Sequence, residues 1–503
     1  MLKIGWSRRD VSTEEPVYIP GQHRMRVSKG ILDPITVNCL AVDDGTDIAI
    51  FLSGDFVTGG GVINEIRKKV SEKNAEIPVD KILYSVTHTH AGACYQKEDI
   101  RFEAPHEGVE IAPLEKYRTF FTDQASDAIV EAYETREEGA IAYGYGFAVA
   151  GHHRRVVYKD DLSLRPNGGK PLFKSLWVNG KAAMYGHTND DNFDRYEGVV
   201  DHIINIMFTF DKDEKLTGAI INVPCPSQNM EQEEMLSADF WHNVRTILRD
   251  KYGDIGILAQ CAAGGDMAPR MLHYKEAEAR RFMLKYANQK LNPELLYPQE
   301  MYKRMEIAGR ICEAFDEVYS WAKKDISKDV PVRHTVKTIE LPARLITEEE
   351  RAFVEEDLAA MEAEPFVSTG DKKADFVYNT TKLGGISRHR AVLKRYEKQK
   401  SKKTETVEMH VICIGDVAFA SNPFELFIDY QHRMQARSPF IQTFIIQLCG
   451  QPDEYCEGGY LCTEAAELNR GYSATMYCNL VSPKGGDALV EETVSELKKL
   501  HDA

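Results

Sequence analysis

The sequence predicts an α/β fold in which mixed sheets are covered by helices. Apolar strand-like segments alternate with amphipathic helical segments along most of the 503 residues, which is the rhythm of βαβ units. Polar residues directly follow several of these strands, as they do where loops at one edge of a sheet form a binding site. No internal repeat or low-complexity linker interrupts the pattern, so we predict a single domain spanning residues 1–503.

The order of the elements follows from the spacing of apolar residues and from the turn residues between them. Strands are expected at 38–42, 48–52, 82–86, 203–210, 217–223, 255–260, 407–414 and 440–448. Helices are expected at 61–73, 113–136 and 486–501, with another helix between the strands at 217–223 and 255–260. Residues 272–402 are expected to form a largely helical insertion or lid in the middle of the chain.

The composition excludes several classes of partner. The formal net charge is -16, which argues against a nucleic-acid surface or an anionic membrane surface, because both require basic patches. No signal-peptide core or bilayer-spanning apolar run is present, and the ten cysteines form no CxxC pair or regular framework. We therefore expect a cytoplasmic protein without stable membrane association, acting on a small-molecule substrate. Its oligomeric state is left open.

Two histidines are the first candidates for chemistry. The strand at 82–86 runs into Thr87-His88-Thr89-His90-Ala91-Gly92. In an extended chain, His88 and His90 point to the same side, because side chains alternate with a period of two. Neutral imidazole is a common zinc ligand, so the pair predicts a metal site. The alternative is a hydrogen-bonded pair of loop histidines.

Four further loops after strands carry functional side chains. They contain Ser53-Gly54-Asp55, Gly264-Gly265-Asp266, Asn422-Pro423-Phe424-Glu425 and Gly458-Gly459-Tyr460. Loops at the carboxyl ends of strands would converge on one cleft. Each loop alone has a simpler interpretation, because an aspartate after a strand is often a helix cap or a turn residue.

Taken together, these motifs resemble the neutral ceramidase superfamily, whose members are zinc-dependent amidases. The matching segments are Thr-His-Thr-His-Ala-Gly at 87–92, Gly-His-His-Arg-Arg at 151–155, Gly-Gly-Asp-Met-Ala-Pro at 264–269, Asn-Pro-Phe-Glu at 422–425 and Gly-Tyr-Leu-Cys-Thr at 459–463. They occur in order over about residues 5 to 500. The resemblance implies a ceramidase catalytic-domain-like fold. The chain ends with a catalytic-type helix, so we expect the family's C-terminal immunoglobulin-like domain to be missing.

The resemblance also implies a set of site residues. The family holds zinc with two histidines, a glutamate and a tyrosine. His88, with His90 beside it, matches the first histidine, and Glu425 and Tyr460 match the other two ligand types. Tyr472 matches a second active-site tyrosine that stabilises the tetrahedral intermediate, and Arg154 matches a substrate-contacting arginine.

The first departure from the family concerns the second histidine ligand. It should follow the strand at 217–223, where this sequence has Pro224-Cys225-Pro226. Cys225 is the nearest ligand-capable side chain, and a thiolate is a good zinc ligand. An inert buried cysteine is the equal alternative, in which case His90 or His187 would complete the metal shell.

The second departure concerns a serine that the family carries just before the proline of the 264–269 motif. This chain has Ala268 there, so hydrolysis is expected to rely on metal-bound water. Asp266 or Asp55 would then act as the general base, or as a hydrogen-bond partner of a metal-bound histidine.

The sequence thus predicts a zinc-dependent hydrolase acting on a polar amide or glycoside. His153, His187 and Asp190 lie in loops rich in hydrogen-bonding groups and are the predicted substrate-binding residues. One alternative is a metal-free glycoside hydrolase that uses paired carboxylates. The carboxylates available for it are Asp55, Asp190, Asp191, Asp266 and Glu425. Another alternative is a relative that binds a carbohydrate or lipid without turnover.

Overall fold

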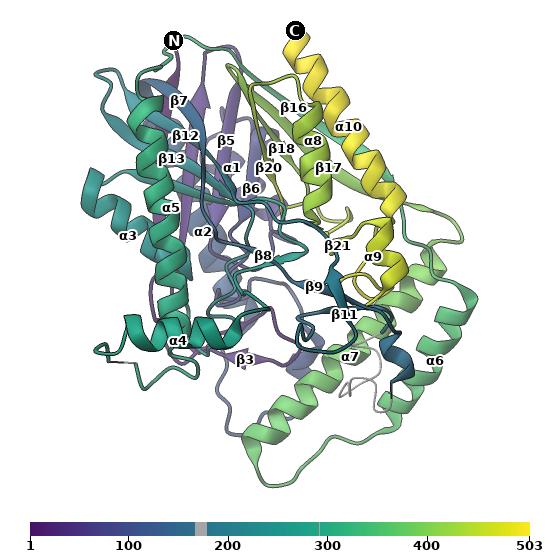
Figure 1. Cartoon of the computed structure of the whole chain (residues 1–503). Helices are drawn as coiled ribbons and strands as arrows, with labels where there is room; N and C mark the ends of the chain where they lie inside the picture. The colour runs from purple at the N-terminus through teal and green to yellow at the C-terminus, as the bar shows by residue number, and fades with distance from the viewer. Residues whose placement is uncertain (166–178, 291) are drawn as a thin grey trace.

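Two β-sheets packed face to face form the centre of the structure, and helices cover the outer face of each sheet (Figure 1). The structure is a computed structural model that describes residues 1–165, 179–290 and 292–503. Aromatic residues of both sheets meet between them. Phe51 of the larger sheet lies 5.0 Å from Phe419 of the smaller one, measured between ring centroids. The fold is therefore a mixed α/β arrangement of four layers, in agreement with the predicted class.

The larger sheet holds eight strands. Their order is β14 (Gly256–Cys261), β13 (Leu216–Val223), β12 (Ile203–Asp211), β7 (Glu137–Phe147), β1 (Lys3–Asp10), β4 (Thr36–Asp43), β5 (Ile48–Gly54) and β6 (Ile82–Val86). The pairs β13–β14 and β5–β6 are parallel, and the other pairs are antiparallel. The outer face is covered by α1 (Ile63–Lys73), α2 (Leu114–Glu134), α3 (Phe240–Tyr252) and α5 (Glu300–Ala322).

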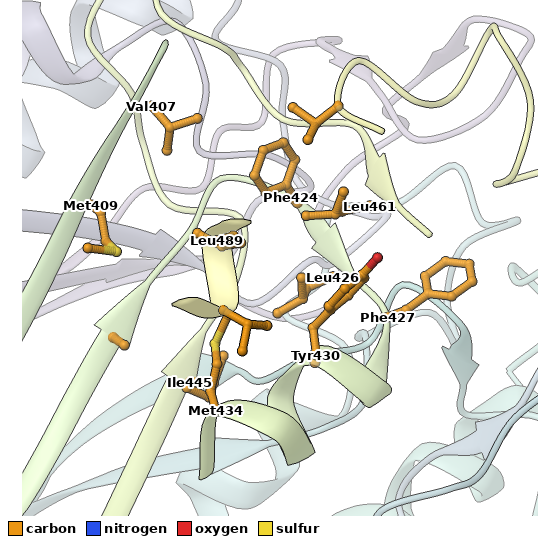
Figure 2. Close-up of a cluster of buried hydrophobic side chains, with 14 of the residues drawn as sticks. Val407, Met409, Phe424, Leu426, Phe427, Tyr430, Met434, Ile445, Leu461 and Leu489 are labelled. Carbon is orange, nitrogen blue, oxygen red and sulfur yellow. The ribbon is translucent and has the colours of Figure 1, made fainter. Parts of the chain in front are cut away.

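The smaller sheet holds four strands in the order β16 (Val332–Pro342), β17 (Thr404–Ile414), β18 (Val417–Ser421) and β20 (Gln442–Ile446). Helices α8 (Ile428–Arg437) and α10 (Pro483–Asp502) cover it, and Figure 2 shows apolar side chains such as Met409, Ile445 and Leu489 filling this layer. Gly486 allows α10 to approach α8, because a Cβ atom there would lie 2.3 Å from Cζ of Tyr430.

Shorter elements complete the chain. The short strands are β2 (Tyr18–Ile19), β3 (Arg26–Val27), β8 (His152–His153), β9 (Arg155–Tyr158), β10 (Ala182–Met184), β11 (Phe193–Tyr196), β15 (Met267–Ala268), β19 (Glu425–Leu426) and β21 (Tyr460–Leu461). The remaining α-helices are α4 (Lys275–Lys285), α6 (Glu348–Ala363), α7 (Lys372–Lys398) and α9 (Glu464–Asn469). Across the described ranges, no helix combines the length and apolar character needed to cross a bilayer. All ten cysteines lie in described segments, where they are buried and have free thiols.

The predicted strands and helices outside 272–402 occur close to their expected positions, but that range is not one helical insertion. Its strand β16 pairs with β17 along its whole length in the smaller sheet. Its helix α5 packs on α3 and β7, as part of a layer that covers the larger sheet. Helices α4, α6 and α7 are the parts of this range that lie outside the four layers (Figure 1). Strands β1 and β7 were not predicted.

Asp55 anchors the larger sheet and does not line the main cavity described below. Its fully buried carboxylate accepts hydrogen bonds from Nη1 and Nη2 of Arg245 in α3, at 2.6 and 3.0 Å. It also accepts from the backbone N–H of Thr36 at 2.8 Å. This ion pair ties α3 to the ends of β4 and β5. The position corrects the expectation that Asp55 is a general base, because its oxygens are committed to these structural contacts.

We predict that Arg245→Gln lowers the free energy of unfolding by about 3–5 kcal/mol, because the substitution leaves the Asp55 carboxylate buried without a counter-ion. Lys251→Gln in the same helix is the control. Lys251 pairs with Asp316 near the surface, where a salt bridge contributes less than about 1 kcal/mol. Urea unfolding measures both values. Equal, small losses in the two variants would contradict this account.

Candidate active site

A cavity of about 750 Å³ lies at the edge where β6, β13, β14 and β18 end, and α7 forms part of its wall. Strand ends of both sheets meet here, so loops far apart in the sequence converge. The wall consists largely of polar and charged side chains. Its aliphatic members are Val57, Ile100 and Met184. Such a wall favours a ligand that carries hydrogen-bonding and charged groups.

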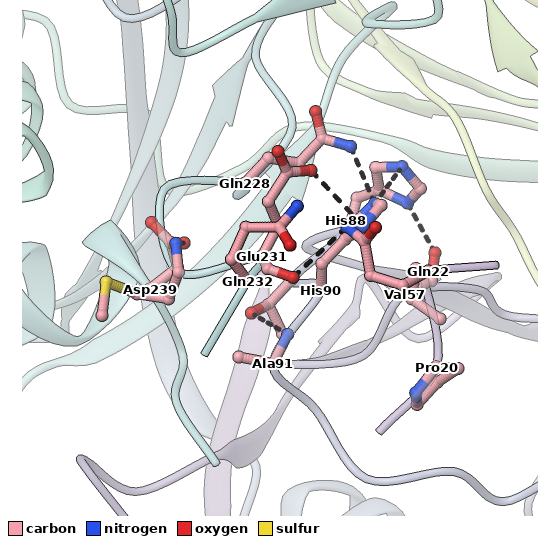
Figure 3. A network of polar contacts seen from close by, with 12 residues as sticks. Pro20, Gln22, Val57, His88, His90, Ala91, Gln228, Glu231, Gln232 and Asp239 are labelled. Carbon is pink, nitrogen blue, oxygen red and sulfur yellow. Dashed lines mark hydrogen bonds and ion pairs between the residues drawn. The ribbon is translucent and has the colours of Figure 1, made fainter. Parts of the chain in front are cut away.

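His88 lies at the centre of this cavity, two residues after β6. Its φ of 60° is in the left-handed region, which a non-glycine residue rarely occupies outside functional sites. Its Nδ1 lies 2.5 Å from the carbonyl oxygen of Val57 (Figure 3). Because a carbonyl only accepts, Nδ1 must carry the proton, and the neutral ring then presents a lone pair at Nε2. That Nε2 lies 3.4 Å from Oε2 of Glu425.

His90 is held by Gln228, a residue that follows β13. Nη1 of Arg154 donates to Oε1 of Gln228 at 3.2 Å, and this contact orients the amide so that Nε2 of Gln228 faces Nε2 of His90 at 2.7 Å (Figure 3). The lone pair of His90 therefore accepts a hydrogen bond. Burial and the nearby cationic groups hold the pKa of His90 well below its usual value. His90 is thus a neutral residue whose ring position is fixed by Gln228.

Glu425 and Tyr460 stand side by side because β19 and β21 form a parallel bridge with these two residues in register. Burial raises the pKa of Glu425, but His88 and Arg154 outweigh it and leave that pKa below the usual value. Gly265 of the preceding loop fits closely against this bridge, since a Cβ atom there would lie 2.3 Å from the carbonyl oxygen of Glu425.

Arg154 connects these groups from a fully buried position between β8 and β9. Its Nη2 donates to the carbonyl oxygen of Gly265 at 2.8 Å and to the hydroxyl of Tyr460 at 3.2 Å. The same nitrogen lies 3.4 Å from Oε2 of Glu425. One guanidinium therefore sets the relative positions of the loops that carry Gln228, Gly265, Glu425 and Tyr460.

Tyr472 faces the same space. Its ring lies 5.7 Å from that of Tyr460 and 5.8 Å from that of His23. Burial is the main cause that raises the pKa of Tyr472, to about 12, so the phenol keeps its proton at neutral pH. It can therefore act as a hydrogen-bond donor to a ligand in the cavity.

Solved structures identify this arrangement of sheets. No family model and no curated protein sequence matches the chain. The crystal structure of neutral ceramidase from Pseudomonas aeruginosa matches 100% of this chain and 74% of its own, with a TM-score of 0.65 and 14% identity. The chain has the neutral ceramidase fold. A ceramidase complexed with C2 matches 100% of this chain and 75% of its own, with a TM-score of 0.63 and 13% identity.

Within this ceramidase fold, Cys225 does not reach the cavity. Its side chain is buried in the apolar layer between the larger sheet, α3 and α5. Its Sγ donates to the carbonyl oxygen of Pro226 at 3.4 Å, and burial keeps the pKa of the thiol well above its usual value. The expectation that Cys225 replaces the missing histidine ligand is therefore corrected. Gln228, three residues on, lines the cavity instead, together with Glu231 and Gln232 of the same loop.

Four other expected site residues also lie outside the main cavity. Asp266 and His153 line a separate cavity of about 390 Å³ beside the first turn of α8. There Oδ1 of Asp266 accepts from the backbone N–H of Ile428 at 3.0 Å. His187 is exposed, and Asp190 pairs with Arg165 at 2.5 Å. These positions correct the expectation of a base at Asp266 and of substrate contacts from His153, His187 and Asp190.

The sequence did not single out several residues of the cavity wall. They are Gln22, His23, Gln96, Glu98, Asp99, Arg101, Gln228, Glu231, Gln232, Arg270, Ser387 and Arg388. Gln228 alone carried a signal, because it lies in the loop where a polar ligand was sought. The others come from loops or from α7, where charged residues are typical of an exposed surface.

The side chains of the cavity could bind a metal ion only with a tyrosine among the ligands. In the described part of the chain, no three His, Cys, Asp and Glu side chains form a metal-binding group. His88 offers an imidazole lone pair beside the Glu425 carboxylate, and the Tyr460 phenol is the neighbouring third donor. Three protein ligands with one open position are typical of catalytic zinc sites. The chemistry of the donor set fits zinc.

We predict that His90 stays neutral below the usual pKa range of an imidazole, and that Gln228→Glu raises the pKa of His90. The new carboxylate would favour the imidazolium form, since an opposite charge stabilises it. Imidazole NMR over a pH series measures both effects. Gln232→Glu is the control, because Gln232 accepts from Arg24 instead of contacting His90. Titration of wild-type His90 within the usual range of an imidazole would contradict this geometry.

Proposed function

We propose that this protein is a metal-dependent hydrolase that cleaves an amide bond in a substrate with a polar, charged end. The observation that supports the proposal is that His88, Glu425 and Tyr460 line one polar cavity with Arg154 and Tyr472, and that Nε2 of His88 lies 3.4 Å from Oε2 of Glu425. The likeness of the fold to ceramidases supports the choice of an amide over a glycoside.

His88, Glu425 and Tyr460 would hold the metal, and zinc is the ion that suits an imidazole, a carboxylate and a phenolate. A bound zinc ion would supply Lewis acidity and lower the pKa of a coordinated water. The hydrogen bond from Nδ1 of His88 to Val57 fixes the tautomer that leaves Nε2 available. Nε2 of His90 lies 3.3 Å from Nε2 of His88 but accepts a hydrogen bond from Gln228, so we assign the ligand role to His88.

The protein's own groups would then manage charge and proton transfer. Ala268 has no hydroxyl and is buried in β15, so the nucleophile is water and not a side chain. Tyr472 keeps its proton and would donate to the carbonyl oxygen as negative charge develops there. With Glu425 assigned to the metal, Glu231, whose Oε2 lies 3.9 Å from Nδ1 of His90, is the carboxylate beside the two histidines from which a base for water would come.

The paired-carboxylate alternative loses most of its candidates. Asp55, Asp190, Asp191 and Asp266 do not line the main cavity, which leaves Glu425 alone from the predicted set. We therefore do not propose a glycoside hydrolase on those residues. A binding protein without turnover is the alternative that the experiments below decide.

A second cavity qualifies the expectation of a wholly polar substrate. It has about 720 Å³, shares Tyr185 and Arg270 with the first, and is lined between α4 and α5 by apolar residues including Phe282, Met283 and Tyr302. An amide with a charged end and an aliphatic arm would fill both spaces. Substrate screens should therefore include amides with and without an aliphatic chain.

We predict about one zinc per chain in protein purified with zinc, and background levels in His88→Ala and Glu425→Gln, because each substitution removes a donor of the three. Plasma mass spectrometry measures the content. Two controls use residues outside the cavity, the exposed His187→Ala and the buried Cys225→Ser, and both should retain zinc. Loss of zinc in Cys225→Ser, or equal zinc in His88→Ala and wild type, would overturn the assignment of ligands.

We predict that Tyr472→Phe lowers kcat by about 10²–10³ on an amide that the wild type hydrolyses, with little change in KM, because the lost donor acts on charge formed in the transition state. Tyr477→Phe is the matched control, since its hydroxyl contacts His389 and lies outside the cavity wall. Steady-state kinetics on a panel of amides tests this. Equal kcat values in wild type and Tyr472→Phe would rule out the donor role.

A further inference from the structure

The four arginines of the main cavity differ in how their charge is balanced. Three of them face a carboxylate: Arg101 pairs with Asp99 (2.5 Å), Arg270 with Glu231 (2.6 Å) and Arg154 with Glu425 (3.4 Å). Within the described residues, Arg388 has no carboxylate within 4.0 Å. The one further acidic residue of the wall, Glu98, is exposed. Arg388 is thus the cation of this site that lacks a counter-ion.

Arg388 packs beside two tyrosine rings, but no carboxylate of the described residues balances its charge. Its guanidinium carbon lies 5.7 Å from the ring centroid of Tyr472 and 5.8 Å from that of Tyr477. Its Nη2 donates to Sγ of Cys478 at 3.4 Å, and its Nε is buried without a hydrogen-bond partner. The Tyr472 phenol also forms a hydrogen bond with the guanidinium. A thiol and a phenol are neutral acceptors, so neither balances the charge of the half-buried Arg388.

A second observation points the same way. His23 lies in the wall beside Tyr472, and burial together with the nearby charges of Arg388 and Arg101 lowers its pKa to about 4. The backbone of His23 also lies close to α7, because a Cβ atom at Gly384, one turn before Arg388, would be 3.1 Å from its carbonyl oxygen. This end of the cavity consequently carries a positive potential that would attract an anion.

We infer that Arg388 forms a subsite for an anionic group of the substrate, a carboxylate or a phosphate, and that this contact places the amide beside Tyr472. The inference rests on the proposed amide hydrolase and names the chemical class of its substrate. A guanidinium presents paired donors that match both anions, which explains why an arginine, rather than a neutral donor, would stand here. The alternative is that Arg388 only holds the loop of Tyr472, Tyr477 and Cys478 in place.

Isothermal titration calorimetry of the full chain tests the subsite without requiring turnover. The probes are N-acetylglycine, which carries a carboxylate, N-acetyl-O-phosphoethanolamine, which carries a phosphate, and N-acetylglycinamide, which is neutral. We expect the wild type to bind at least one anionic probe about tenfold or more tighter than the neutral one. Arg388→Gln should abolish that preference. The probe that binds tighter identifies which anion the subsite takes.

Two further variants make the result specific. Arg390→Gln, two residues on in α7, removes an exposed cation that pairs with Glu362, and it should keep the preference. Arg388→Lys keeps the charge without the paired donors and should show an intermediate preference, which also covers the case in which Arg388→Gln fails to fold. Equal binding of anionic and neutral probes by the wild type would overturn the inference, as would an unchanged preference in Arg388→Gln.

The same proteins separate this inference from the proposed function. Hydrolysis of neutral amides without any preference for anions would leave the hydrolase standing and remove the subsite. A preference for anions that depends on Arg388, in a protein that hydrolyses no amide of the panel, would leave the subsite standing and remove the hydrolase.

Discussion

The buried charge of Arg154 is the constraint on which the arrangement of this site depends. A guanidinium enclosed in protein must find acceptors for its N–H groups, or its burial would strongly destabilise the fold. Here the acceptors are the carbonyl of Gly265, the amide of Gln228 and the groups of Glu425 and Tyr460. Gly265 and Gln228 follow strands of the larger sheet, whereas Glu425 follows a strand of the smaller one. The stacking of the two sheets and the geometry of the cavity therefore depend on each other.

The presence of Gln228 changes what each histidine can do. Its amide is oriented by Arg154 and donates to His90, so one residue links the buried charge to the protonation state of a histidine. His90 is kept neutral and positioned, and His88 presents its Nε2 lone pair beside Glu425. The loop after β13 thus positions a histidine and does not itself supply an imidazole donor.

The sequence predicted the convergence of the strand-end loops well, because residues directly after parallel strands must lie at one edge. His88 and Glu425 line one cavity for that reason, since they follow β6 and β18. Arg154, Tyr460 and Tyr472 line it too, but they were expected there only from the resemblance. What it could not predict was the direction of each side chain within a loop. Asp55 and Cys225 follow strands as closely as His88 does, and Asp266 follows one within five residues, yet each turns toward a structural partner.

Helix α7 shows that the sequence also could not predict which charged surface residues face the cavity. Its run of basic residues at 388–402 has the pattern of a solvated helix face, and most of the run is exposed or half-buried. Only the packing of α7 over the cavity brings Arg388 to the wall. Strand β16 was missed because charged residues, among them Arg333, Lys337 and Glu340, interrupt its apolar pattern. In both cases the elements packed against the segment, and not its own sequence pattern, decide its position in the structure.

X-ray absorption at the zinc edge of the zinc-loaded protein tests the central claim most directly. The account predicts a first shell of nitrogen and oxygen ligands at about 2.0–2.2 Å, from one histidine, one glutamate, one tyrosine and solvent, without sulfur. His88→Ala should retain too little zinc to give this first shell. A sulfur ligand at about 2.3 Å would contradict the account, because it would place a cysteine such as Cys225 on the metal. A shell unchanged by His88→Ala would contradict it equally.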